Sequence, residues 1–206
     1  MGAKAASPKV LLITSAIAGE GKSTTALHLA AVLAQHQARV LLIDCDLRQG
    51  ALATKLELPL QPGLTDVLTG LTNLSSSIRP VGSVSGLSFL SSGQRPRVRA
   101  AVLLDSPQAK VLLEEARQQF DYIVLNSPAT LGLSDVLNLG QLADGAVLVV
   151  RQGVTLRQES KRAEGILRGA GVPVLGYVVN DVSLGSQGLN TKTYRQMYAA
   201  QNGETA

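Results

Sequence analysis

The residues from Ser15 to Thr25 read SAIAGEGKSTT and are the part of this sequence best suited to bind phosphate. Gly19 and Gly21 allow backbone N–H groups to turn toward an anion. Lys22 can reach the β- and γ-phosphates of a nucleotide, and the Ser23 hydroxyl can ligate Mg²⁺. These residue types at this spacing therefore predict a nucleotide-binding loop.

The flanking sequence favours this interpretation over a glycine-rich turn that merely contains a lysine. The apolar run 10–14 precedes the loop and predicts a buried strand, and apolar residues at helical spacing predict a helix from near Ser23. The helix N-terminus adds a partial positive charge beside a bound phosphate. One departure is Ala16, which stands at the first glycine of the general pattern G-x-x-x-x-G-K-[ST].

Two carboxylates, Asp44 and Asp46, directly follow a second apolar run at residues 39–43. Open α/β sheets bind ligands at the carboxyl ends of their strands, so we expect both side chains to face such a crevice. One acid could hold Mg²⁺ through water while the other accepts a hydroxyl proton. Two acids on a solvated loop remain the alternative.

Strands and helices are predicted to alternate along the chain. Further strands are expected at residues 87–90, 122–126, 146–150 and 174–180, and helices at residues 63–68, 107–120 and 156–168. This alternation predicts an α/β fold, with a mostly parallel sheet and helices on both faces. We expect one domain over residues 1–206, with residues 185–206 as a polar C-terminal tail.

Composition narrows the classes of partner. Apolar residues make up 45% of the 206 residues and aromatic residues only 3%, which suits a parallel sheet covered by helices. The net charge of +4 allows an acidic or nucleotide partner without requiring nucleic acid. The single cysteine, Cys45, excludes an internal disulfide, fits a reducing cytosol and is expected to be a small buried residue. Arginines in such a loop more often form a solvated surface than a site, so we expect a solvated surface for the three arginines of residues 91–99.

Three stretches resemble the catalytic domain of bacterial tyrosine kinases, the polysaccharide-associated autokinases. Residues 18–24, AGEGKST, are similar to that family's P-G-E-G-K-S-T. Residues 42–48, LIDCDLR, resemble its D-x-D-x-R motif, and residues 120–128, FDYIVLNSP, resemble its F-D-Y-V-I-I-D-T-P. The similarity runs from Lys9 to Asn180 and implies a P-loop NTPase fold. Partition-type ATPases share that fold but carry lysine at the position of Ile17, which argues against them.

The resemblance also implies roles for single residues. Catalysis would rest on Asp44 as the base for a tyrosine hydroxyl, with Lys22 and Asp46. Mg²⁺ would be held by Ser23, Asp46 and the residue at position 126. ATP or ADP would be contacted by Ala18, Gly19, Glu20, Gly21, Lys22, Ser23, Thr24, Arg48 and Asn180, with Asn180 reading the adenine base or simply ending a strand.

Two departures from the family bear on activity. Asn126 stands where the family has the Walker B aspartate, so nucleotide binding could persist while phosphate transfer weakens. The tyrosine-rich tail of the family is reduced to Tyr194 and Tyr198, which are the candidate phosphoacceptors unless they pack on a terminal helix.

The implied function is a Mg²⁺/ATP-dependent protein-tyrosine autokinase linked to the synthesis and export of capsular polysaccharide or exopolysaccharide. It would be cytoplasmic, at the inner face of the membrane, with a membrane-bound co-polymerase or activator segment as partner, possible self-association and no nucleic acid. The alternatives are a nucleotide-binding regulatory module without efficient chemistry, or a partition-like ATPase.

Overall fold

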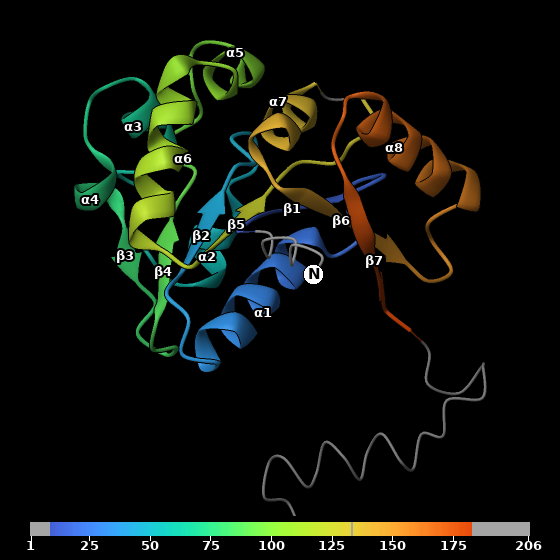
Figure 1. Ribbon diagram of the computed structural model, residues 1–206, viewed down its shortest axis with the longest axis horizontal. Helices are drawn as coiled ribbons and strands as arrows, with labels where there is room; N and C mark the ends of the chain where they lie inside the picture. The colour runs from blue at the N-terminus through green and yellow to red at the C-terminus, as the bar shows by residue number, and fades with distance from the viewer. Residues whose placement is uncertain (1–8, 133, 183–206) are drawn as a thin grey trace, which may run out of the picture.

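A computed structural model describes residues 9–132 and 134–182, which form a sheet of seven strands flanked by helices (Figure 1). The strands are β1 Val10–Ser15, β2 Val40–Asp44, β3 Arg79–Pro80, β4 Leu87–Leu90, β5 Tyr122–Asn126, β6 Gly145–Arg151 and β7 Val174–Asn180. The helices are α1 Lys22–Gln35, α2 Ala51–Lys55, α3 Leu64–Leu68, α4 Leu74–Ser77, α5 Ala100–Leu104, α6 Pro107–Gln119, α7 Asp135–Leu142 and α8 Arg157–Gly169.

The sheet has the strand order β3-β4-β2-β5-β1-β6-β7. All neighbouring strands pair in parallel except β3, which runs antiparallel to β4. The predicted mostly parallel sheet is therefore confirmed. Strand β3 was missed because it has only two residues, one of them Pro80, and proline is confined to sheet edges. The predicted tail, residues 185–206, lies outside the described residues.

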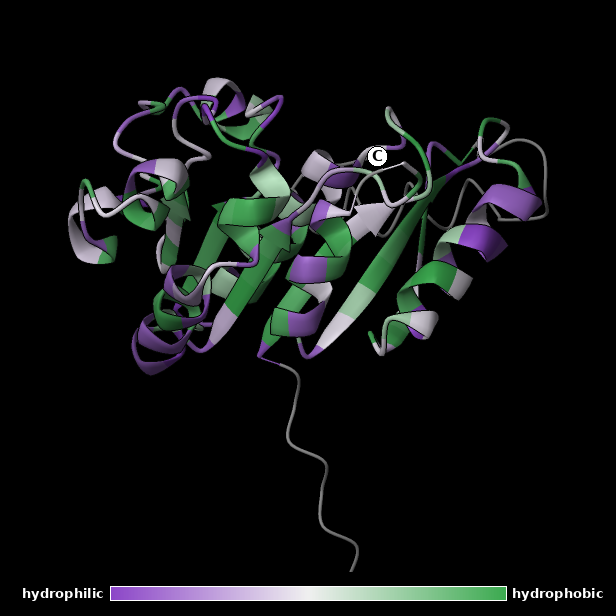
Figure 2. Cartoon of the chain, turned by 90° about the horizontal axis from the view of Figure 1, so that it is seen from above, coloured by the Kyte–Doolittle hydropathy of each residue, from purple (hydrophilic) through white to green (hydrophobic). Residues whose placement is uncertain are grey.

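Alternating residues of the central strands enter two separate hydrophobic cores. In β1, Leu12 packs into a core covered by α3–α8, while Ile13 packs into a second core against the alanines of α1. In β5, Leu125 packs into the first core and Val124 into the second. The central strands are thus buried on both faces, which explains their nearly continuous apolar sequences (Figure 2).

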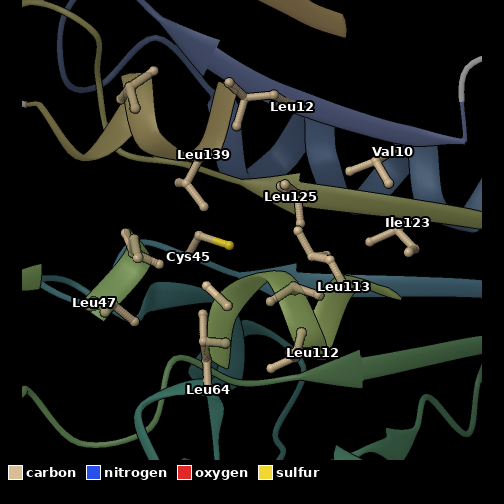
Figure 3. Packing of buried hydrophobic residues seen from close by; sticks show 14 of the residues in the cluster. Val10, Leu12, Cys45, Leu47, Leu64, Leu112, Leu113, Ile123, Leu125 and Leu139 are labelled. Atoms are coloured by element: carbon tan, nitrogen blue, oxygen red, sulfur yellow. The ribbon is translucent and has the colours of Figure 1, made fainter. Parts of the chain in front are cut away.

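Cys45 lies within the larger core, as its small apolar character predicts. Figure 3 shows its sulfur among side chains that include Leu125 and Leu139. The side chain is 3% exposed, and burial raises the pKa of the thiol well above its ordinary value. Cys45 is therefore a packing residue at the end of β2.

The topology brings three chain segments to one edge of the sheet. Strand β5 lies between β1 and β2, with Asn126 in register with both Ile13 and Asp44. The carboxyl ends of β1, β2 and β5 are therefore neighbours, and the phosphate-binding loop follows β1 directly. Among the described helices, none is long and apolar enough to cross a membrane.

Candidate nucleotide and phosphoryl-transfer site

The loop after β1 has the backbone conformation that its glycines predict. Gly21 caps the N-terminus of α1 with φ 94°, in the left-handed region that favours glycine. A Cβ atom at this position would lie 2.0 Å from the side-chain nitrogen of Asn180. Glycine is therefore required here both by the backbone angle and by the close approach of β7.

Lys22 occupies the first turn of α1 and is only 9% exposed. Burial lowers the pKa of its ammonium group, while the negative charges of Asp46 and Glu20 act in the opposite direction. Asp46 thus acts on the loop lysine electrostatically although the two residues come from different strand ends. The catalytic roles of Lys22 and Asp46 stay predictions.

Glu20 has a structural role that the sequence reasoning missed. Its side chain is fully buried, with Oε2 accepting a 2.7 Å hydrogen bond from the backbone N–H of Ile17. Its Oε1 accepts a hydrogen bond from the hydroxyl of Thr155, in the turn between β6 and α8. The carboxylate therefore stabilises the conformation of the loop, and other backbone N–H groups of the loop remain available to bind a phosphate.

The ends of β6 and β7 also contact the loop. Asn180 Nδ2 donates a 3.1 Å hydrogen bond to the backbone oxygen of Glu20. Arg151 lies within 3.5 Å of the Gly19 carbonyl through Nη1 and pairs with Asp181 at 2.8 Å. Asn180 is thus placed beside the nucleotide loop, and its predicted reading of adenine stays a prediction. The sequence analysis did not predict this contact of Arg151.

Asp44 and Asn126 meet in the buried interior of the site. Asn126 Nδ2 donates a 2.9 Å hydrogen bond to Oδ1 of Asp44, and Asp44 Oδ2 accepts one of 3.2 Å from the backbone N–H of Leu52. Asp44 is fully buried, and this burial raises its pKa to about 6 despite the opposing hydrogen bonds from Asn126, Leu52 and Asp46. A carboxyl group with this pKa is suited to accept a proton near neutral pH.

The other atom of the Asn126 amide is unsatisfied. Asn126 is 1% exposed, and its Oδ1 has no hydrogen-bond partner among the described residues. A buried acceptor without a partner requires an explanation, and a water bound to a metal ion would provide the missing donor. Ser23, Asp46 and Asn126 supply oxygen atoms, the ligand type that Mg²⁺ prefers. The residues therefore fit the predicted ion, which usually takes few protein ligands beside phosphate and water.

Arg48 forms an ion pair that the sequence analysis did not identify. Its guanidinium group donates to both carboxylate oxygens of Asp135 at the start of α7: Nη2 lies 2.9 Å from Oδ2 and 3.3 Å from Oδ1, and Nε lies 3.2 Å from Oδ2. Asp135 is 2% exposed, so the pair shields a buried carboxylate. The arginine of the D-x-D-x-R motif thus fixes the loop after β2 to α7, and its contact with nucleotide stays a prediction.

The remaining predicted residues fall into two groups. Ala18, Ser23 and Thr24 lie in the loop and first turn of α1, where the sequence placed them. Tyr194 and Tyr198 lie outside the described residues. The exposed Lys55 of α2, which was not predicted, donates a 3.2 Å hydrogen bond to the Thr24 hydroxyl and adds a positive charge beside the loop.

Comparison with known proteins places this site in a family. Residues 8–156 match the family described as an AAA domain. Tyrosine-protein kinase YwqD of Bacillus subtilis is 38% identical over 176 residues, covering 85% of this chain and 73% of the relative. Tyrosine-protein kinase ptk of Acinetobacter johnsonii is 37% identical over 82% of this chain, but the chain spans only 23% of that relative's length.

Solved structures give the same result. The kinase domain of VpsO superposes with a TM-score of 0.81 at 33% identity, covering 85% of this chain and 86% of the other. The septum site-determining protein MinD of Pyrococcus horikoshii, solved with Mg-ADP, has a TM-score of 0.73 at 21% identity and shows a shared fold alone. On this evidence, the chain belongs to the bacterial tyrosine-protein kinase family, within the P-loop NTPases.

Proposed function

We propose that this chain is a Mg²⁺/ATP-dependent protein-tyrosine kinase domain with slow phosphate transfer. The observation that carries the proposal is the buried hydrogen bond between Asp44 and Asn126. These two residues end β2 and β5, the paired strands beside the nucleotide loop. Asp44 supplies a proton acceptor, whereas Asn126 supplies an amide where the family has a carboxylate. Binding and transfer therefore depend on different residues of one site.

In the proposed reaction, the tyrosine oxygen attacks the γ-phosphorus of ATP and ADP departs as the bond from that phosphorus to the β,γ-bridging oxygen breaks. Asp44 accepts the hydroxyl proton. Lys22 and the backbone N–H groups of residues 19–23 hold the phosphates and neutralise charge, which is the main protein contribution to phosphoryl transfer. Mg²⁺, held by Ser23, Asp46 and water on Asn126, would supply further neutralisation of phosphate charge.

The proposal includes a setting in the cell. By resemblance to its family, the domain would act at the cytoplasmic face of a membrane, where a co-polymerase or activator segment of a polysaccharide export system regulates it. Tyr194 and Tyr198 are candidate acceptors within the chain. Self-association would allow transfer between copies.

A second candidate function is a nucleotide-dependent regulatory module that binds ATP without efficient transfer. The neutral amide at Asn126 favours it, because charge-assisted hydrogen bonds are about twice as strong as neutral ones. A partition-like ATPase is less favoured, since Ile17 occupies the position of the lysine expected there.

Incubation with ATP labelled at the γ-phosphate separates these functions, with Lys22→Met as control. A kinase places label on tyrosine, a partition-like ATPase releases labelled phosphate, and a regulatory module does neither while still binding nucleotide. Label on tyrosine that is absent in Lys22→Met supports the proposal. Prompt release of phosphate without phosphotyrosine contradicts it.

A further inference from the structure

A basic pocket adjoins the transfer site on the side away from β7. It has a volume of about 460 Å³ and is lined by Arg48 and Asp135 together with the arginines at positions 95, 97 and 99. A second pocket of about 490 Å³ shares Leu47, Arg48 and Arg95 with the first, so the two hollows adjoin along one surface. These volumes lie in the range of ligand-binding clefts, about 300–1,000 Å³.

The positive charge of this pocket is largely uncompensated. Arg48 is neutralised by Asp135, whereas the guanidinium groups of Arg95, Arg97 and Arg99 form no ion pair or hydrogen bond with any residue that the structure describes. All three are exposed on the loop between β4 and α5. Three adjacent guanidinium groups without carboxylate partners favour an anionic ligand.

The position of the pocket separates it from the nucleotide site. The loop 91–99 follows β4, which pairs with β2 on one side of Asp44. Asn180 and Arg151, which contact the nucleotide loop, follow β7 and β6 on the other side. Asp44 therefore lies between the groups expected to hold ATP and the arginines of the loop 91–99, which is where an acceptor hydroxyl must arrive. Gly132, Ser134 and Asp135, which follow β5, complete the pocket lining on the other side of β2.

We propose that the pocket lined by Arg95, Arg97 and Arg99 binds an acidic segment of the protein whose tyrosine is phosphorylated. This inference rests on the proposed kinase function and adds the class of its substrate. Arg48 is four residues beyond Asp44, so their Cα atoms are at most about 15 Å apart. An extended peptide covers that distance in about four residues, which places its acidic residues about three to five positions from the tyrosine.

The charge of the chain's own tail fits this pocket poorly. Tyr194 lies between Lys192 and Arg195, and the only acidic residue of positions 183–206 is Glu204. The proposed occupant is therefore an acidic segment other than residues 183–206. A peptide is favoured over single-stranded nucleic acid, because the pocket lining formed by the described residues contains no aromatic side chain for base stacking.

The test uses a tyrosine peptide with Glu at three to five positions from the tyrosine and a matched peptide with Gln in those positions. The protein is compared with the triple variant Arg95→Ala/Arg97→Ala/Arg99→Ala. The control variant Arg157→Ala/Lys161→Ala/Arg162→Ala removes the same charge from exposed positions of α8, which packs on β6 and β7 at the opposite edge of the sheet. Two quantities are measured: kcat/KM for phosphorylation, and the affinity for unreactive Phe analogues of both peptides in the presence of ADP.

We expect the acidic peptide to bind and react about tenfold better than the Gln peptide. The triple arginine variant should lose this preference through a higher KM for the acidic peptide, whereas the α8 variant should keep it. All three arginines are replaced together because each exposed ion pair contributes little. An Arg→Lys version of the triple arginine variant should retain most of the affinity. The preference should also weaken as salt is raised from 50 to 300 mM.

Several results would overturn the inference. These are equal binding of both peptides, equal losses in the two alanine variants, or displacement of the acidic peptide by single-stranded nucleic acid at physiological salt. Failure of the kinase proposal is distinguishable from these, since the Phe peptides would then still bind through the arginines while no phosphotyrosine forms.

Discussion

Asn126 Nδ2 lies 2.9 Å from Oδ1 of Asp44 and joins the carboxyl ends of β5 and β2 by a buried hydrogen bond. Because the amide nitrogen donates to Asp44, the amide oxygen remains as a buried neutral acceptor without a partner among the described residues. A carboxylate at position 126 would lose this donor and place a second negative charge beside Asp44. One residue would thus set both the environment of the proposed base and the strength of the proposed metal site.

Lys22→Met should abolish most of the thermal stabilisation that Mg-ATP or Mg-ADP gives to the protein. A ligand bound only by the native state adds about 2.7 kcal/mol at a concentration 100 times its Kd, and Lys22 lies in the loop that would hold the phosphates. The measurement is the melting temperature with and without nucleotide. A shift of equal size in both proteins would remove the phosphate-binding role from this loop.

Asp44→Asn should lower tyrosine phosphorylation far more than ATP affinity. General bases contribute factors of about 10²–10⁴ in rate, while ATP is held mainly by the loop after β1. Kinetics of transfer are compared with the Kd for ATP, and the melting temperature serves as a control for the loss of the bond from Leu52 N–H. If affinity and transfer fall by the same factor, Asp44 belongs to the metal site or the scaffold.

Gly21→Ala should destabilise the protein by about 1–3 kcal/mol and weaken nucleotide binding. The reasons are the left-handed backbone and the overlap of the new Cβ with Asn180. Gly165→Ala, in α8 with open space around it, is the matched control and should stabilise by about 0.5–1 kcal/mol. Urea unfolding of both variants checks the prediction, and a Gly21→Ala variant as stable as the wild type would contradict the described loop.

Asp144 should stabilise the start of β1 in a pH-dependent way. It accepts 2.7 Å hydrogen bonds from the backbone N–H groups of Lys9 and Val10, and pairs with Arg117 at 2.8 Å. Burial alone would raise its pKa, but these hydrogen bonds, first that of Arg117, bring the pKa below its ordinary value.

Since the folded pKa of Asp144 is lowered, its stabilisation is present above the unfolded pKa of about 3.9 and is lost as the pH falls through the folded pKa. Asp144→Asn should therefore be less stable than the wild type by about 1–3 kcal/mol at pH 7. The difference should shrink as the pH falls below about 4. A difference that does not change with pH would show that the charge of Asp144 is not what matters.

The sequence predicted the parts of this site that follow directly from strands. The loop at 15–25, the acids after β2 and the residue ending β5 were all placed correctly in the sheet, because the carboxyl ends of parallel strands meet at one edge. The apolar runs that form these strands are the strongest local signal in the chain.

Contacts between distant segments could not be predicted from local patterns. Arg48 and Asp135 are 87 positions apart, and Glu20 and Thr155 are 135 apart, so no spacing or periodicity links them. The sequence suggested nucleotide contact for Glu20, whereas the structure shows its buried side chain bracing the loop. The unpaired state of the three arginines after β4 likewise became visible only once their neighbours were known.

In the proposed function, the domain binds nucleotide while the amide of Asn126 limits phosphate transfer. The measurement is the rate of tyrosine phosphorylation across a Mg²⁺ titration, in the wild type and in Asn126→Asp. Removing the amide donor puts two carboxylates in contact at Asp44, so without Mg²⁺ the variant should be less stable than the wild type.

With Mg²⁺, the new carboxylate should hold the metal-bound water more strongly, so Asn126→Asp should regain its stability and transfer phosphate faster at lower Mg²⁺ concentrations. The wild type should bind ATP with similar affinity yet remain slow at every Mg²⁺ concentration. Identical rates and identical Mg²⁺ dependence in the two proteins would show that Asn126 has no role at the metal and would contradict slow transfer through its amide.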